Sequence, residues 1–177
     1  MGELAYKICI FGETCVGKTT LARRFLKGYF EENIQITMGA EIFVKFMQID
    51  DIKIVLQVWD FGGERIFTFL LPLYSRGSSG GIFMFDLSRY ETLENVEAWV
   101  DTFRKEQTTE KIDIPVLLVG GKSDLKDQIN FSRKEGDKIA QRYNLFDYID
   151  CSSKTGENVE LVFETLLRKI LTDKMII

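Results

Sequence analysis

A glycine-rich segment near the start of the chain has the residue types and spacing needed to hold a phosphate group. Gly12-Glu13-Thr14-Cys15-Val16-Gly17-Lys18-Thr19 matches the pattern G-x-x-x-x-G-K-S/T. Glycines let backbone amides surround an anion, and the helix that is expected next adds the partial positive charge of its N-terminus. Lys18 can reach the β- and γ-phosphates of a nucleotide, and the hydroxyl of Thr19 can bind Mg²⁺. The segment predicts nucleotide binding but does not distinguish kinases, ATPases and GTPases.

A second set of polar residues follows an apolar run further along the chain. Val116–Val119 leads through two glycines into Lys122-Ser123-Asp124. In open α/β sheets, ligands bind beyond the carboxyl ends of the strands. There the Asp124 carboxylate can accept hydrogen bonds from the two N–H donors on the Watson–Crick edge of guanine, a pair that adenine lacks, while the stem of Lys122 lies along the base. These residues favour guanine as the base.

The hydrophobic pattern predicts the elements that must position these residues. Buried strands are expected at 4–11, 41–49, 52–59, 81–85, 114–119 and 146–150. Amphipathic helices are expected at 19–27, 91–106, 132–143 and 157–171, the third opening with a capping box of Ser132 and Glu135. The close spacing of the second and third strands indicates an antiparallel hairpin. The pattern predicts an α/β fold with a six-stranded, mostly parallel sheet, one antiparallel strand, and helices on both faces.

Composition and charge exclude several classes of function. The chain has 177 residues, a net charge of −4 and no internal repeat, which predicts a single domain over residues 1–177 and no nucleic-acid partner. It contains no histidine, so catalytic triads and metal sites that need one are excluded. The three cysteines lack CxxC spacing, which argues against a disulfide framework or a zinc site. Without a signal-like or membrane-spanning segment, we expect a cytoplasmic location, with any membrane recruitment made through a partner.

The chain resembles the small GTPases of the Ras superfamily, and the Rab branch within it, over nearly its whole length. Besides the phosphate loop, four stretches follow in the order of that family: Thr37-Met38-Gly39 resembles switch I, Trp59-Asp60-Phe61-Gly62-Gly63 the D-x-x-G of switch II, Gly121-Lys122-Ser123-Asp124 the N-K-x-D motif, and Cys151-Ser152-Ser153-Lys154 the S-A-K loop. Rab-like detail occurs at Tyr74-Ser75-Arg76-Gly77, Phe85-Asp86-Leu87 and Asn95-Val96-Glu97-Ala98-Trp99. The resemblance implies a P-loop NTPase of the G-domain type, with GTP or GDP and Mg²⁺ as its ligands.

The resemblance also implies a role for individual residues. Thr19, Thr37 and Asp60 would hold Mg²⁺, and Thr37 and Gly63 would sense the γ-phosphate through their backbone amides. The residues expected to bind the nucleotide are Glu13, Thr14, Cys15, Val16, Gly17, Lys18, Thr19, Thr20, Phe30, Thr37, Gly63, Lys122, Asp124, Ser152, Ser153 and Lys154. Those expected to take part in hydrolysis are Lys18, Thr37, Gly63 and Glu64.

Two residues depart from the family pattern. Glu64 stands where most members have the glutamine that orients the attacking water. A carboxylate can accept a hydrogen bond from that water, but it cannot donate to the phosphoryl oxygens and its charge opposes theirs, so slow hydrolysis is expected. Gly121 replaces the asparagine of N-K-x-D, and the lost hydrogen bond predicts faster nucleotide exchange than in a typical relative. Gly121→Asn is therefore expected to slow the release of GDP.

The sequence therefore predicts a monomeric guanine-nucleotide switch that hydrolyses GTP slowly, with vesicle traffic as the process that the Rab-like resemblance implies. Effectors, exchange factors and GTPase-activating proteins are expected at switch I, about 31–41, and switch II, about 60–76. The last residues, 174–177, contain no cysteine, so no encoded prenyl anchor is expected. Glu64 and Gly121 leave open a non-hydrolysing pseudo-GTPase that acts as a scaffold. A P-loop kinase is disfavoured because no arginine-rich acceptor lid is visible.

Overall fold

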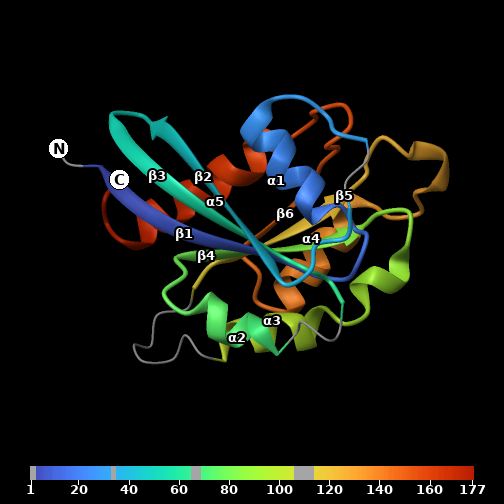
Figure 1. Cartoon of the computed structure of the whole chain (residues 1–177). Coiled ribbons are helices and arrows are strands. Elements are labelled where there is room, and N and C mark those ends of the chain that lie inside the picture. Colours follow the sequence, from blue (N-terminus) through green and yellow to red (C-terminus); the bar gives the residue numbers. More distant parts are fainter. Residues whose placement is uncertain (1–2, 33–34, 65–68, 106–113) are drawn as a thin grey trace.

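Six strands form one twisted sheet in the computed structural model, which describes residues 3–32, 35–64, 69–105 and 114–177 (Figure 1). The strands are β1 (Leu4–Phe11), β2 (Ala40–Ile49), β3 (Ile52–Phe61), β4 (Gly80–Asp86), β5 (Val116–Gly121) and β6 (Asp147–Asp150). Their order across the sheet is β2-β3-β1-β4-β5-β6. The β2–β3 pair is antiparallel and the other four pairs are parallel, which confirms the sheet that the sequence predicts.

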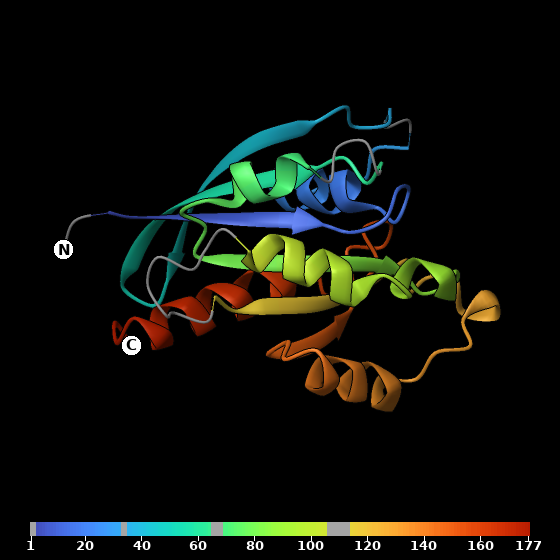
Figure 2. The same ribbon diagram turned by 90° about the horizontal axis from the view of Figure 1, so that it is seen from below.

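Helices cover both faces of the sheet, as expected (Figures 1 and 2). The helices are α1 (Lys18–Lys27), α2 (Leu70–Ser75), α3 (Val96–Arg104), α4 (Arg133–Arg142) and α5 (Val159–Asp173), with short 3₁₀ turns η2 (Tyr90–Leu93) and η3 (Lys126–Gln128). Helices α1 and α5 pack on one face, whereas α2, α3 and α4 pack on the other. Among the described residues, no helix has the length and apolar content to span a membrane.

Alternate residues of each central strand supply two separate apolar layers, because successive side chains point to opposite faces. Ile8 and Ile10 of β1 join the layer beneath α1 and α5, and Cys9 and Phe11 join the layer beneath α2, α3 and α4. In the second layer the Phe11 ring stacks on Phe103 of α3, with ring centroids 4.8 Å apart. The strands are thus fixed from both sides, and the carboxyl ends of the five mutually parallel strands lie together at one edge of the sheet.

Several expected boundaries differ from the structure. The helix expected at 91–106 is divided into η2 and α3, and its expected last residue lies outside the described residues. Helix α5 begins at Val159 rather than at 157, because Asn158 has a left-handed φ of 57° that a helix interior excludes. Strand β5 begins at Val116, directly after Pro115, which has no backbone N–H for a ladder. Helix α2 was not expected, because its six residues are too few to show a helical repeat of apolar residues.

The packing of α1 against α5 can be tested by its contribution to the stability of the apolar layer beneath these two helices. The Phe163 ring of α5 stacks on Phe25 of α1 with centroids 3.7 Å apart, and both side chains are fully buried. Replacing Phe163 by alanine leaves a cavity, so Phe163→Ala is expected to lower the free energy of unfolding by about 3–5 kcal/mol. Chemical denaturation measures this loss. Leu161→Ala, two residues earlier on an exposed position of the same helix, is the control and should change stability by less than about 0.5 kcal/mol; similar losses for the two variants would contradict the packing.

Candidate functional site

The phosphate loop connects β1 to α1 at the carboxyl edge of the sheet. Two positions of this loop have a backbone conformation that favours glycine. Gly12 and Gly17 have φ values of 135° and 105°, which side chains rarely allow. A Cβ on Gly12 would also overlap the carbonyl oxygen of Met84 on the neighbouring strand β4. These two glycines therefore let the loop run close along β4 and turn directly into α1.

Lys18 bridges the loop from inside. Its side chain is buried, and its Nζ donates to the carbonyl oxygens of Gly12 at 3.0 Å and Glu13 at 2.6 Å. Burial lowers the pKa of the Lys18 ammonium to about 8, and the charges of Asp60 and Glu13 act in the opposite direction. An anion in the loop would add a further negative charge beside this buried cation, and so would favour its charged form.

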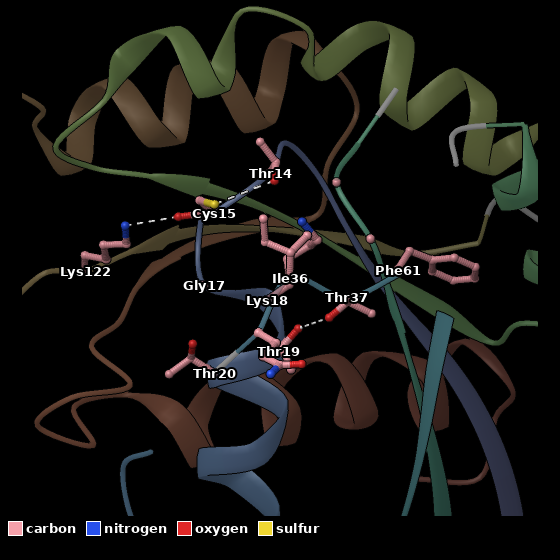
Figure 3. Close-up of a pocket in the computed structure, with 13 residues that line it drawn as sticks. Thr14, Cys15, Gly17, Lys18, Thr19, Thr20, Ile36, Thr37, Phe61 and Lys122 are labelled. Atoms are coloured by element: carbon pink, nitrogen blue, oxygen red, sulfur yellow. Dashed lines mark hydrogen bonds between the residues drawn. The ribbon is translucent and has the colours of Figure 1, made fainter. Parts of the chain in front are cut away.

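Three oxygen-bearing side chains from distant segments meet beside Lys18. The Thr19 hydroxyl lies 2.7 Å from that of Thr37 (Figure 3). It also donates to Asp60 Oδ2 at 2.5 Å. The other oxygen, Asp60 Oδ1, is buried and has no hydrogen-bond partner among the described residues. Burial raises the pKa of the Asp60 carboxyl to about 6, against the hydrogen bond from Thr19 and the charge of Lys18. An unpartnered carboxylate oxygen beside two hydroxyls fits Mg²⁺, which takes oxygen ligands and completes its shell with water and phosphate.

The expected phosphate end of the site is a cavity of about 250 Å³. It is lined by Thr14, Cys15, Gly17, Lys18, Thr19, Thr20, Gln35, Ile36, Thr37, Phe61, Gly62, Gly63 and Lys122 (Figure 3). Gly63 approaches the loop so closely that a Cβ there would overlap the peptide between Glu13 and Thr14. Glu64, the next residue, is exposed and does not line the cavity. Residues 33–34 and 65–68 of the two expected switches lie outside the described residues.

The expected base end is an adjoining cavity of about 220 Å³. It is lined by Val16, Gly17, Thr20, Phe30, Met84, Lys122, Asp124, Leu125, Ser153 and Lys154. Asp124 Oδ1 accepts a hydrogen bond from the buried Ser152 hydroxyl at 2.6 Å, so its carboxylate is held in one orientation. Gly17, Thr20 and Lys122 line both cavities, which together fall within the roughly 300–1,000 Å³ of small-molecule sites.

Two residues that we expected to bind the nucleotide line neither cavity. The Glu13 carboxylate turns toward α3, where its Oε1 accepts hydrogen bonds from Trp99 Nε1 at 3.0 Å and Asn95 Nδ2 at 3.1 Å. Ser152 lies behind Asp124 and holds that carboxylate. The other expected nucleotide-binding residues all line one cavity or both. The structure therefore brings together residues of five separate motifs, and it leaves Glu13 and Ser152 outside both cavities.

A buried carboxylate with two partly exposed cations lies behind the phosphate loop, and no sequence motif predicts this cluster. The Asp86 carboxylate at the end of β4 contacts Lys122 Nζ at 2.7 Å and Arg89 Nε at 3.0 Å. Arg89 then donates to the carbonyl oxygens of Thr14 at 3.3 Å and Cys15 at 3.1 Å, and Lys122 donates to that of Cys15 at 3.1 Å. In the sequence, Asp86 is distinguished only by its place in a Rab-like segment. Nothing in the local sequence indicates that Arg89 lies near a loop more than 70 positions earlier.

The charge state of Asp86 is set by two opposing effects. Burial by itself raises the pKa of this carboxyl, but hydrogen bonds from Lys122, Ser88 and Arg89 outweigh burial and leave the pKa below its ordinary value. Asp86 is therefore ionised at neutral pH, and it holds two cations in position against the carbonyl groups of the loop.

The three cysteines provide a chemical test of the cavity. Cys9 and Cys151 are buried, and burial raises the pKa of each thiol to about 12, whereas Cys15 is exposed and lines the phosphate cavity. A thiol reagent should label Cys15 alone in the nucleotide-free native protein, because reaction needs an accessible thiolate. GDP with Mg²⁺ should slow that labelling, as measured by mass spectrometry. Cys15→Ser is the control for residual labelling. Fast labelling of a second cysteine, or labelling that GDP leaves unchanged, would contradict the location of the site.

A comparison with protein families agrees with this arrangement. The model of the Ras family matches residues 7–172, which include the phosphate loop, the Thr37 and Asp60 segments, and the loops that carry Asp124 and Ser153. The match covers most of the chain and all six strands, apart from the first residues of β1. Members of this family bind guanine nucleotides, generally with Mg²⁺, and act as GTPase switches. The chain belongs to the Ras family.

Proposed function

We propose that this protein is a Rab-like guanine-nucleotide switch that hydrolyses GTP slowly. The observation that carries the proposal is the junction of the two cavities, which share Gly17, Thr20 and Lys122. One end offers the phosphate loop and Lys18, and the other offers the fixed carboxylate of Asp124. A ligand that spans them carries phosphates at one end and a base with two adjacent N–H donors at the other, as GTP and GDP do.

The contacts around Thr19 suggest how the protein would respond to the γ-phosphate. Thr37 precedes β2, and Asp60 and Gly63 lie at and beyond the end of β3, so both segments converge on the loop. Mg²⁺, when bound, would offset the charge of the β- and γ-phosphates. Thr37 and Gly63 would each donate a backbone hydrogen bond to the γ-phosphate. Loss of the γ-phosphate would therefore remove the contact that holds both segments.

Slow hydrolysis follows from the place and chemistry of Glu64. Its carboxylate would accept a hydrogen bond from the attacking water, but its negative charge would lie near the negative phosphoryl oxygens. Glu64 is exposed and does not line the cavity, so it must turn inward before it can contact that water. The same observation favours the second candidate, a nucleotide-bound scaffold that does not hydrolyse GTP.

The proposed surface for effectors and regulators lies beside the two switch segments. On the edge strand β2, Ile42, Val44 and Phe46 expose between 50% and 73% of their surface. The Trp59 and Tyr74 rings, 5.9 Å apart, lie near them on the same side of the sheet. We propose a monomer that presents this apolar surface to partner proteins, including those that would recruit it to membranes in vesicle traffic.

Hydrolysis is the property that separates the two candidate functions. In a single-turnover assay with Mg²⁺, we expect slow conversion of GTP to GDP and phosphate. ATP, the control nucleotide, should not be hydrolysed. Glu64→Gln should accelerate this turnover, because glutamine can both accept from water and donate to the phosphoryl oxygens. Glu64→Ala is the matched control for loss of the side chain. Equal rates for the two variants would show that Glu64 takes no part, and GTP that is bound but never hydrolysed would favour the scaffold.

Release of GDP should depend on Arg89. Arg89→Ala removes two hydrogen bonds to the loop, whereas Asp86 keeps its contacts with Lys122 and Ser88. We therefore expect GDP to dissociate roughly two- to tenfold faster, as followed with a fluorescent GDP analogue. Arg133→Ala, which alters an exposed arginine on α4, should leave the rate unchanged. An unchanged rate in Arg89→Ala would mean that the loop does not need this contact.

A further inference from the structure

A methionine side chain occupies the space that a side chain at position 121 would need. Met84 lies on β4, is almost fully buried, and lines the base cavity. A Cβ built on Gly121 would lie 2.5 Å from the terminal methyl of Met84, and one built on Gly17 would lie 3.4 Å from the same methyl. The end of the Met84 side chain is therefore located between the last residue of β5 and the last glycine of the phosphate loop.

Space, and not backbone conformation, limits the side chain that position 121 can carry. Gly121 is absent from the glycines with left-handed φ values, so other residues can adopt its backbone conformation. The same Cβ would lie 3.1 Å from the carbonyl oxygen of Val16, which belongs to the phosphate loop. A side chain at 121 must therefore displace Met84, the loop, or both. Met84 is the easier to move, because its colliding atom ends a flexible chain.

We propose that Met84 is a positioning residue for the nucleotide: its methyl supports the phosphate loop at Gly17 and closes the floor of the base cavity, and Gly121 leaves room for it. This inference rests on the proposed function, because it concerns how the same site holds a guanine nucleotide. Met84 and Gly121 form one packing unit, in which a large apolar side chain on β4 is matched by the absence of a side chain on β5.

The pairing changes what is expected of a substitution at position 121. From the sequence, Gly121→Asn is expected to slow GDP release by restoring a hydrogen bond. In the structure, the Cβ of a side chain at 121 would lie 2.5 Å from the terminal methyl of Met84. Displacing that methyl would withdraw the support that we propose for Gly17. The single substitution should therefore accelerate release as long as residue 84 is methionine.

The first experiment compares alanine at two adjacent glycines of β5. In Gly121→Ala, the added methyl group enters the space of Met84; in Gly120→Ala, it would meet Leu87 and Tyr148 at 2.8 Å on the opposite face of the sheet. Release of a fluorescent GDP analogue and thermal stability are measured for both variants. Gly121→Ala should release GDP at least about fivefold faster than the unchanged protein. Gly120→Ala should be destabilised without faster release.

A double-mutant cycle tests whether Met84 carries the effect. Met84→Ala removes the colliding methyl, so adding Gly121→Ala to it should accelerate release by less than about twofold further. Met84→Leu provides a variant of conserved volume that should fold normally, but its shorter side chain cannot reach both Gly17 and Gly121. Met84→Leu should release GDP faster while its thermal stability without nucleotide stays close to that of the unchanged protein.

The possible results separate this inference from the proposed function. If the unchanged protein binds no guanine nucleotide, the proposed function fails, and the inference fails with it. If it binds GDP normally but Gly121→Ala and Met84→Leu release GDP at the unchanged rate, only the role of Met84 is overturned. Effects of Met84→Ala and Gly121→Ala that multiply in full would also overturn it, because they would show that the two positions act independently.

Discussion

Four consecutive carbonyl groups of the phosphate loop, from Gly12 to Cys15, accept hydrogen bonds from three cationic side chains. Lys18 binds the first two carbonyls, Arg89 the last two, and Lys122 shares the carbonyl of Cys15. A loop whose carbonyls are engaged by cations can present its amides to an anion without collapsing onto itself. The rest of the site depends on this arrangement, because the loop joins the phosphate end to the base end.

The supports of the loop come from the ends of different strands, and this explains why a parallel sheet suits the site. Asp86 ends β4 and holds Arg89, and Lys122 directly follows β5. Glu13 adds a further connection, since its carboxylate ties the loop to Trp99 on α3. Two apolar layers fix the strands from both sides, so the ends of the strands keep their spacing. Because the sheet is rigidly packed, the side chains that support the loop are held in fixed positions.

The described residues of the segments that would respond to the nucleotide meet the loop through smaller contacts. Thr37 is joined to the loop through the hydroxyl of Thr19, and Gly63 contacts it through close backbone approach. Neither contact involves a large apolar side chain. Such segments separate at a smaller free-energy cost than the packed strands, which is what a switch requires. The exposed apolar side chains of β2, the surface proposed for partner proteins, begin shortly after Thr37 in the chain, so a partner bound there would contact this segment as well.

The sequence by itself determined the sheet, most helices, the capping box of Ser132 and the residues that converge on the two cavities. These features depend on neighbouring residues: alternation, amphipathic spacing, and glycines at fixed positions. Only the tertiary structure decided the strand order, the break before α3, the turning away of Glu13, and the contacts of Arg89 and Met84 with the loop. Arg89 contacts a loop 74 positions earlier, and Met84 on β4 limits the space at Gly121 on the neighbouring strand β5. Such contacts depend on which strands become neighbours and on the space left between side chains, and no local pattern records either.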